Sequence, residues 1–356
     1  MHHYLLNSLW VTLLLASCGG ATPHITVVCE ENNVGNCIVK WEMSPRSEGM
    51  VKVYASLNPN DIPEKYPVAT APIANQRMTI VTSNPNRRYY YTLLFNDKYR
   101  VKVATRNVNI PGIQNFRDLG GYQSYTTHKQ TRWGMLYRSA QVDMPGFPAY
   151  RELQNMGIKT IIDLRTFAEQ RLSLPPPQDT FNVVHIPLQI RSIEHILTDI
   201  RDHRIKSDTV YRIAEQMNRD LIKQHPQAFR QIFDVLLNAD NYPVMIHCTS
   251  GNGRTGVVTA LILAAIGVDD DVIMSDYLLS NSYFDIPRAS SYAYSLPVRS
   301  QEAVTMIYSS RESYIKAAFN EAEREEGSIE DYLLKAVGLS KSEIKQLQYL
   351  LLESAQ

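Results

Sequence analysis

The chain has 356 residues, more than one hydrophobic core usually holds, so we expect two domains. Its 36 Lys and Arg residues balance 36 Asp and Glu residues, which argues against nucleic acid as a partner. Hydrophobic residues make up 44% and charged residues 20%, as in a folded globular protein rather than a disordered one. The four cysteines, Cys18, Cys29, Cys37 and Cys248, show no metal-binding spacing, so we predict no metal site.

Residues 1–17 have the pattern of a secretory signal peptide, because the apolar stretch 4–15 is too short to span a bilayer and small residues follow it. The join Leu-Ala-Ser-Cys-Gly at 15–19 resembles the bacterial lipobox, although the start of the chain carries His rather than Lys or Arg. This resemblance implies an exported lipoprotein, anchored in a membrane through acylated Cys18 on the periplasmic face or at the cell surface. An ordinary signal peptide with an unrelated Cys is the alternative.

A linker at 18–23 precedes a predicted all-β domain over residues 24–107. Short runs with alternating or β-branched residues recur between turn signals at 25–28, 37–41, 51–54, 78–81, 88–93 and 99–104. The spacing indicates a β-sandwich, and the runs resemble a fibronectin type III or immunoglobulin-like module, for which we expect a spacer or docking role. Cys29 and Cys37 flank a turn-like run and have two open interpretations, a disulfide or two buried thiols.

From residue 108 to 356 the pattern becomes α/β, and Pro111-Gly112 marks the boundary. Strands are predicted at 160–164, 183–186 and 244–247, and helices over 211–237, 255–266 and from about 300 onward.

Residues 247–256, His-Cys-Thr-Ser-Gly-Asn-Gly-Arg-Thr-Gly, connect a predicted strand to a predicted helix, and we call them the glycine-rich loop. Glycines let the backbone turn tightly, so successive N–H groups can point inward, and the helix N-terminus favours an anion. The same environment favours the thiolate form of Cys248. The planar fork of Arg254 can bind two phosphate oxygens. These features predict attack on a phosphate monoester through a cysteinyl-phosphate intermediate.

Two other interpretations fit the loop less well. Gly251, Gly253 and Gly256 match the dinucleotide-binding fingerprint, but no acidic strand end follows about twenty residues later, and Cys248 and Arg254 would have no role. A Walker A loop is excluded because no Lys precedes Thr255.

The sequence His-Cys-x5-Arg-Thr-Gly resembles the signature of cysteine-dependent tyrosine and dual-specificity phosphatases. Further segments are similar to one bacterial branch of that family, whose motif is Asn-Phe-Arg-Asp-Leu-Gly-Gly: 115–122, 136–139, 157–165, 275–281 and 327–333. The resemblance covers about 110–356. It implies a twisted, mainly parallel sheet with helices on both faces, and it implies no cofactor.

The resemblance also assigns roles within the loop. Cys248 becomes the nucleophile, Arg254 the phosphate clamp and Thr255 the hydroxyl that supports the thiolate. The phosphate cradle is formed by the backbone N–H groups of Thr249, Ser250, Gly251, Asn252, Gly253 and Arg254. His247 would orient the loop, and a bracing role is implied for Arg117, Asp118, Arg138, Asp163 and Arg165.

The loop departs from the bacterial branch at two positions. That branch usually reads Gly-Lys-Asp-Arg, whereas this chain has Asn252 and Gly253 in place of the Lys and of the Asp proposed as general acid. The segment 185–194 contains no Asp, so Glu194 and the later Asp199 are the candidate acids.

With less help for the leaving group, we expect phosphotyrosine in a protein or peptide, or another aryl phosphomonoester, to be preferred over alkyl phosphates. The alternatives are a phosphoinositide or inositol phosphate phosphatase, which the missing Lys makes a weaker expectation, and a phosphate-binding module without turnover.

Aromatic residues gather in the segment 283–297, which has two interpretations. It contains Tyr283, Phe284, Tyr292 and Tyr294. The segment is either a lid that stacks an aromatic substrate or an ordinary surface loop.

Overall fold

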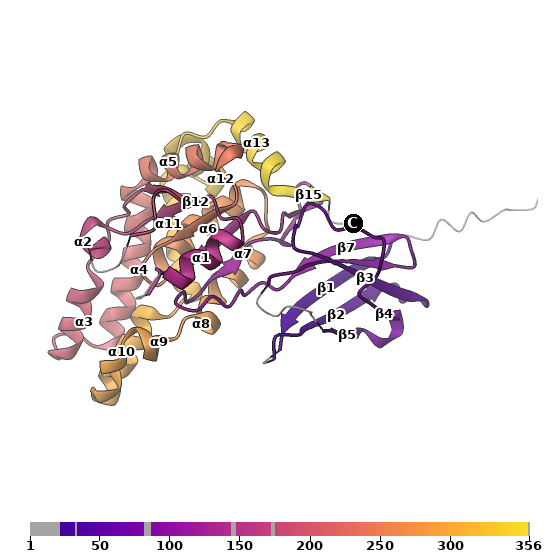
Figure 1. Ribbon diagram of the computed structural model, residues 1–356. Coiled ribbons are helices and arrows are strands. Elements are labelled where there is room, and N and C mark those ends of the chain that lie inside the picture. The colour runs from indigo at the N-terminus through magenta and orange to yellow at the C-terminus, as the bar shows by residue number, and fades with distance from the viewer. Residues whose placement is uncertain (1–21, 33, 82–86, 144–146, 172–174, 355–356) are drawn as a thin grey trace, which may run out of the picture.

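The computed structural model describes residues 22–32, 34–81, 87–143, 147–171 and 175–354, so the predicted signal peptide and Cys18 lie outside the described residues. A β-sandwich forms one end of the molecule and a helix-covered α/β unit forms the other (Figure 1). Within the described part of the chain, no helix has the length and apolar character needed to cross a membrane.

The N-terminal unit consists of two antiparallel sheets that share one hydrophobic core. The first contains β1 (His24–Glu31), β2 (Cys37–Ser44) and β5 (Arg77–Ile80), and the second contains β4 (Ala69–Pro72), β3 (Met50–Ser56), β6 (Tyr90–Phe95) and β7 (Tyr99–Ala104). Alternate residues of β2 point inward, and the rings of Trp41 and Phe95 meet edge-on in the core. The predicted β domain is therefore present. Strand β4 was missed because it is a short edge strand that ends in a Pro.

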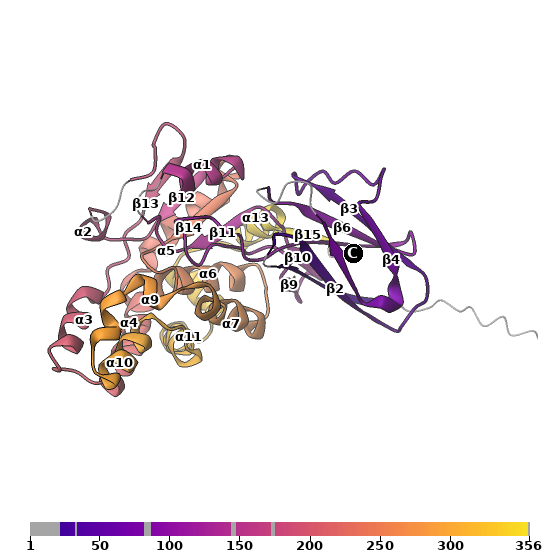
Figure 2. The ribbon, with the colours of Figure 1, turned by 60° about the horizontal axis from the view of Figure 1, so that its bottom comes forward.

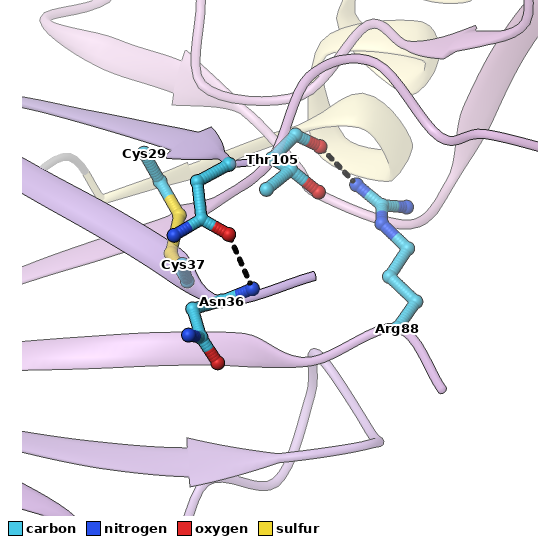
Figure 3. Close-up of a disulfide and its surroundings, with 6 residues drawn as sticks. Cys29, Asn36, Cys37, Arg88 and Thr105 are labelled. Carbon is cyan, nitrogen blue, oxygen red and sulfur yellow. Dashed lines mark hydrogen bonds between the residues drawn. A yellow bond between two sulfur atoms is a disulfide. The ribbon is translucent and has the colours of Figure 1, made fainter. Parts of the chain in front are cut away.

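The disulfide of the sandwich joins Cys29 of β1 to Cys37 of β2 (Figure 3). Their Cα atoms are 6.4 Å apart, within the range that a disulfide spans. Both residues are also buried in the sandwich core. Of the two interpretations left open by the sequence, the structure has the bonded pair.

The C-terminal unit is built on a five-stranded sheet in the order β13-β12-β14-β11-β8. Its strands are β13 (Asn182–His185), β12 (Thr160–Asp163), β14 (Val244–His247), β11 (Leu136–Ser139) and the antiparallel edge strand β8 (Arg117–Asp118). The other four strands are parallel to one another. Every residue of β11, β12 and β14 is buried, as expected for parallel strands covered on both faces.

Helices cover both faces of this sheet, which confirms the predicted fold class. Ile162 and Ile246 face the larger core, to which α4, α5, α6, α7, α11 and α13 contribute, whereas Ile161 and Met245 face a second core under α1. These helices are α1 (Phe147–Asn155), α4 (Ser207–Gln224), α5 (Pro226–Leu237), α6 (Gly253–Ala265), α7 (Asp270–Leu278), α11 (Glu312–Glu326) and α13 (Lys341–Leu351). The single helix predicted over 211–237 is in fact α4 and α5, because Pro226 starts a new helix.

The remaining helices complete the unit. They are α2 (Phe167–Gln170), α3 (Ile193–Arg201), η2 (Ala239–Asn241), α8 (Ser280–Tyr283), α9 (Ile286–Ala289), η3 (Ser291–Ser295), α10 (Val298–Tyr308), α12 (Ile329–Asp331) and the π-helical turn η4 (Tyr332–Ala336), while η1 (Ile73–Asn75) belongs to the sandwich.

A small sheet lies where the two units meet (Figure 2). It pairs β9 (Gln123–Ser124) and β10 (Lys129–Thr131) with β15 (Leu352–Ser354), so the tail that was predicted to be helical ends in a strand. Just after β10, Trp133 is buried among the core residues of the sandwich. The two units therefore share a packed junction.

Candidate active site

The glycine-rich loop leaves the carboxyl end of β14 and enters α6 at Gly253. Gly251 adopts a φ of +72°, and a Cβ there would lie 2.5 Å from the backbone carbonyl of Ser139 in β11. Only glycine permits both the left-handed backbone and this close approach. The loop is thereby held against the sheet, at the edge where α/β proteins bind ligands.

Several backbone N–H groups of the loop are available to bind a ligand. Among the hydrogen bonds of the described residues, none uses the amide N–H of Ser250, Gly251, Gly253 or Arg254. The N-cap residue of α6, Asn252, makes no side-chain capping bond. These amides and the helix N-terminus are therefore available to hold an anion.

Cys248 is a free cysteine at the base of the turn and is 2% exposed. The Thr255 hydroxyl is also buried and has no hydrogen-bond partner among the described residues. A buried hydroxyl without a partner costs stability unless a ligand or a reacting group satisfies it. The hydroxyl is thus available for the role that the family resemblance gives it.

Arg254 is fixed by Glu169 of α2, a partner that the sequence analysis missed. Its Nη1 donates to Glu169 Oε2 at 2.7 Å and its Nη2 to Glu169 Oε1 at 2.5 Å. Thr249 Oγ1 donates to the same carboxylate at 2.8 Å. Although burial opposes ionisation, the hydrogen bonds and charge of Arg254 hold the pKa of Glu169 at about 2. The guanidinium is therefore oriented before any substrate arrives.

Helix α2 holds Glu169 in place through a reciprocal cap. Thr166 Oγ1 accepts from the Glu169 amide at 3.3 Å, and Glu169 Oε2 accepts from the Thr166 amide at 2.9 Å. The Thr-x-x-Glu spacing is typical of a helix start. It carried no information that the Glu would reach Arg254, 85 positions further on.

His247 and Asp163 are neighbours at the ends of β14 and β12. Arg165 binds Asp163 through Nε at 3.0 Å and Nη2 at 2.8 Å, and His247 Nε2 lies 3.7 Å from the same carboxylate. Burial opposes ionisation of Asp163, but His247 and Arg165 keep its pKa well below its ordinary value. Burial lowers the pKa of His247 to about 4, so the imidazole is neutral at neutral pH and suits orientation of the loop.

Arg138 connects the sheet directly to the glycine-rich loop. Its Nη2 donates to the Gly251 carbonyl at 2.7 Å, and its Nη1 binds Asp276 of α7 at 2.7 Å. Arg117 binds Asp276 from the other side at 3.0 Å. Burial opposes ionisation of Asp276, but the two arginines keep its pKa well below its ordinary value. Arg138 thus contacts the loop directly, and Arg117 shares its counter-ion Asp276.

Asp118 lies elsewhere and does not contact the glycine-rich loop. Its carboxylate accepts from the amides of Gly120 and Gly134, each at 2.8 Å, and pairs with Arg88 of the sandwich at 2.8 Å. Since neighbouring residues in a strand point to opposite faces, Arg117 faces the loop and Asp118 faces the sandwich.

The two positions at which the loop departs from the bacterial branch have different environments. Asn252 is buried, and its side chain binds the Asn115 side chain and the Tyr308 carbonyl, so it faces the surrounding protein. A Cβ on Gly253 would meet no heavy atom within 4 Å. The position of the missing Asp is therefore open space.

The two candidate acids also differ. The Asp199 carboxylate is held in ion pairs with Arg204 at 2.9 Å and with Arg191 at 3.6 Å. Glu194 lies at the start of α3, accepts a hydrogen bond from Ser192 at 2.8 Å, and lines a cavity of about 290 Å³ together with Glu169. Glu194 is therefore the better placed of the two.

The aromatic segment 283–297 is helical rather than a loop. It forms α9 and η3, which pack with α3, α4 and α10 around a core of their own. Phe284 stacks on Tyr308 with ring centroids 5.8 Å apart, and the Tyr308 carbonyl binds Asn252. The two interpretations of the segment, a lid or an ordinary surface loop, both stay predictions. The segment nevertheless lies beside the glycine-rich loop.

No group of three or more His, Cys, Asp or Glu side chains within the described ranges could hold a metal ion.

Comparisons with known proteins agree with this geometry. The model of the tyrosine phosphatase family matches residues 108–353. The Cupriavidus necator protein H16_A0669, whose name assigns it provisionally to the tyrosine-protein phosphatases, is 26% identical over 65% of this chain and 85% of its own length. The triple specificity protein phosphatase PtpB of Mycobacterium tuberculosis is 26% identical over 68% of this chain and 98% of its own length. The chain belongs to the tyrosine phosphatase family.

A solved structure also aligns. The crystal structure of P. aeruginosa TpbA is 17% identical and covers 53% of this chain and 96% of that chain, with a TM-score of 0.25.

Proposed function

We propose that this phosphatase hydrolyses phosphate monoesters through a cysteinyl-phosphate intermediate, with Cys248 as nucleophile and Arg254 as phosphate clamp. One observation carries the proposal: a single strand-to-helix turn combines a buried free thiol, backbone donors without partners among the described residues, and an arginine oriented by Glu169. Membership of the tyrosine phosphatase family supports the reaction class.

In the first step the Cys248 thiolate attacks phosphorus, so an S–P bond forms while the ester P–O bond breaks and the leaving oxygen takes a proton. Arg254 and the backbone amides of 249–254 stabilise the charge on the transferring phosphoryl group. In the second step water attacks phosphorus, inorganic phosphate is released, and the Thr255 hydroxyl supports the departing thiolate.

Aryl phosphates, with phosphotyrosine as the physiological class, are the substrates that this site favours. Gly253 has no side chain to act as the acid that the bacterial branch has at this position, and open space lies there instead. Asn252, in place of the Lys, is buried and is not available to contact a highly charged substrate. A phenol leaves more easily than an aliphatic alcohol, so it depends less on an acid.

The full chain should therefore hydrolyse p-nitrophenyl phosphate and a phosphotyrosine peptide, with kcat on phosphoserine or inositol phosphates lower by about a hundredfold or more. The Cys248→Ser variant should be inactive. Equal kcat on aryl and alkyl phosphates would contradict the aryl preference and favour the phosphoinositide alternative. Wild-type protein that binds vanadate without turnover would identify a phosphate-binding module.

Glu194 is the proposed proton donor for the leaving group. It lines the cavity that also contains Glu169, the partner of Arg254, and Asp199 is held in ion pairs instead. Glu194→Gln should lower kcat on a phosphotyrosine peptide by about tenfold to a hundredfold and remove the alkaline limb of the pH–rate profile. Asp199→Asn is the matched control and should keep that limb. Loss of the limb in the control alone would reassign the acid.

We also propose export and membrane anchoring through Cys18. The lipobox-like sequence and the disulfide of the sandwich, which suits an oxidising compartment, support this location. Cells that express the chain and receive labelled palmitate should label the wild type and leave Cys18→Ser unlabelled. Equal labelling would contradict the anchor.

A further inference from the structure

Arg88 of the β-sandwich is buried at the junction with the phosphatase unit. Its side chain is 7% exposed. Its Nη1 contacts Asp118 Oδ2 at 2.8 Å and the hydroxyls of Tyr137 and Tyr90 at 2.9 and 3.0 Å. Its Nη2 donates to the Thr105 carbonyl at 3.0 Å (Figure 3). One side chain of the sandwich thus connects its own strands to β8 and β11 of the phosphatase unit.

The two residues of the phosphatase unit that Arg88 contacts, Asp118 and Tyr137, are each one position away from Arg117 or Arg138. In the register of β8 and β11, Tyr137 is opposite Asp118, and Arg138 is opposite Arg117. Arg138 in turn donates to the Gly251 carbonyl at 2.7 Å. The side chains of Arg117 and Arg138 start from the backbone of β8 and β11, the same two short strands that Arg88 contacts.

Arg106, in the connection between the two units, provides a second route. Its guanidinium lies 3.8 Å from the centre of the Tyr122 ring, and its Nη1 donates to the Asp118 carbonyl at 2.8 Å. The Tyr122 hydroxyl donates to Asp276 at 2.7 Å. Asp276 is the counter-ion of Arg138, so this route also ends at Gly251.

We infer that the β-sandwich is a positioning element of the catalytic unit, and that Arg88 and Arg106 set the geometry of the glycine-rich loop through Asp118, Tyr137 and the Asp276–Arg138 pair. The inference rests on the proposed phosphatase function and assigns the N-terminal unit a role in it beyond that of a spacer. Neither arginine touches the substrate; both act through the residues that hold the Gly251 carbonyl.

The test compares Arg88→Met, Arg88→Lys and Lys102→Met in the full chain. Met keeps the volume of Arg88 without its charge or donors, whereas Lys keeps the charge opposite Asp118 without the fork. Lys102 is the matched control, because its side chain pairs with Glu353 across the same junction at 2.7 Å. Among the described residues, no side-chain hydrogen bond or ion pair joins this pair to the glycine-rich loop. For each variant, kcat and KM for p-nitrophenyl phosphate, vanadate affinity by calorimetry and the melting temperature are measured.

Arg88→Met should lower kcat/KM and vanadate affinity by about tenfold or more, because small displacements of a catalytic loop are costly. Arg88→Lys should recover part of both losses, and Lys102→Met should stay within about twofold of the wild type. If Arg88→Met does not fold, Arg106→Met takes its place as the test, because Arg106 is only half-buried. Arg106→Met should show the same losses of kcat/KM and vanadate affinity.

A lower melting temperature in folded Arg88→Met, with unchanged kcat/KM and vanadate affinity, would overturn the inference and leave Arg88 a purely structural contact. Equal losses in Lys102→Met would also overturn it, because any loosening of the junction would then suffice. A wild type without turnover would refute the proposed function, and the vanadate affinities would still decide the inference.

Discussion

Glu169 orients Arg254 and adds a charge that must stay ionised for the site to hold together. Both carboxylate oxygens receive a guanidinium donor, and the carboxylate is also bonded to Thr249. Glu169→Gln would keep the size of the side chain but lose one acceptor and the charge. We expect kcat/KM to fall by about tenfold or more, since Arg254 would no longer be held in one orientation. Unchanged kinetics would show that the loop alone orients Arg254.

The same pair predicts a pH effect on stability. The pKa of Glu169 is about 2 in the folded protein against 4.5 for the free side chain. A lowered folded-state pKa stabilises the protein above the unfolded pKa, and this contribution is lost as the pH falls from about 4.5 towards 2. Denaturant titrations should therefore show a smaller acid loss of unfolding free energy in Glu169→Gln than in the wild type. Parallel pH curves would contradict the ion pair.

The strand-to-helix turn is the element on which the site depends, and Gly251 is its tightest point. Ala at this position would face both the φ of +72° and a Cβ contact of 2.5 Å with Ser139. Gly157 after α1 has a similar φ of +76° with nothing within 4 Å of its Cβ, so Gly157→Ala isolates the backbone cost. We expect Gly157→Ala to lose about 1–2 kcal/mol of stability and keep its activity.

Gly251→Ala should lose activity by about a hundredfold, because the loop must move away from β11. Steady-state kinetics and thermal melts of the two variants separate these effects. A Gly251→Ala protein with normal kcat would show that the loop is not held against β11.

At the scale of the whole molecule, features formed by adjacent residues could be predicted from the sequence. The residues 247–256 are adjacent in the sequence, so the strand-to-helix turn and the roles proposed for Cys248 and Arg254 could be predicted together. The distant residues that hold this turn in place could not be predicted. Glu169 pairs with Arg254 across 85 positions and Arg117 with Asp276 across 159, and such contacts exist only once the sheet has assembled.

The junction between the two units escaped prediction for the same reason. Asp118 belongs to a motif of the phosphatase unit, yet its ion-pair partner Arg88 comes from the sandwich. Trp133 likewise completes the sandwich core from the other unit. The change from a β pattern to an α/β pattern in the sequence marks where one unit ends and the next begins. It does not show that buried side chains of each unit pack against the other.

The covalent intermediate gives the most direct test of the central claim, that Cys248 attacks phosphorus. The full chain would be mixed with a phosphotyrosine peptide, quenched in acid during turnover, digested and analysed by mass spectrometry. We predict one phosphoryl group on the peptide that contains Cys248, absent in Cys248→Ser and increased in a Thr255→Val variant, in which loss of the hydroxyl slows departure of the thiolate. Turnover in Cys248→Ser, or a phosphoryl group on any other residue, would contradict the account.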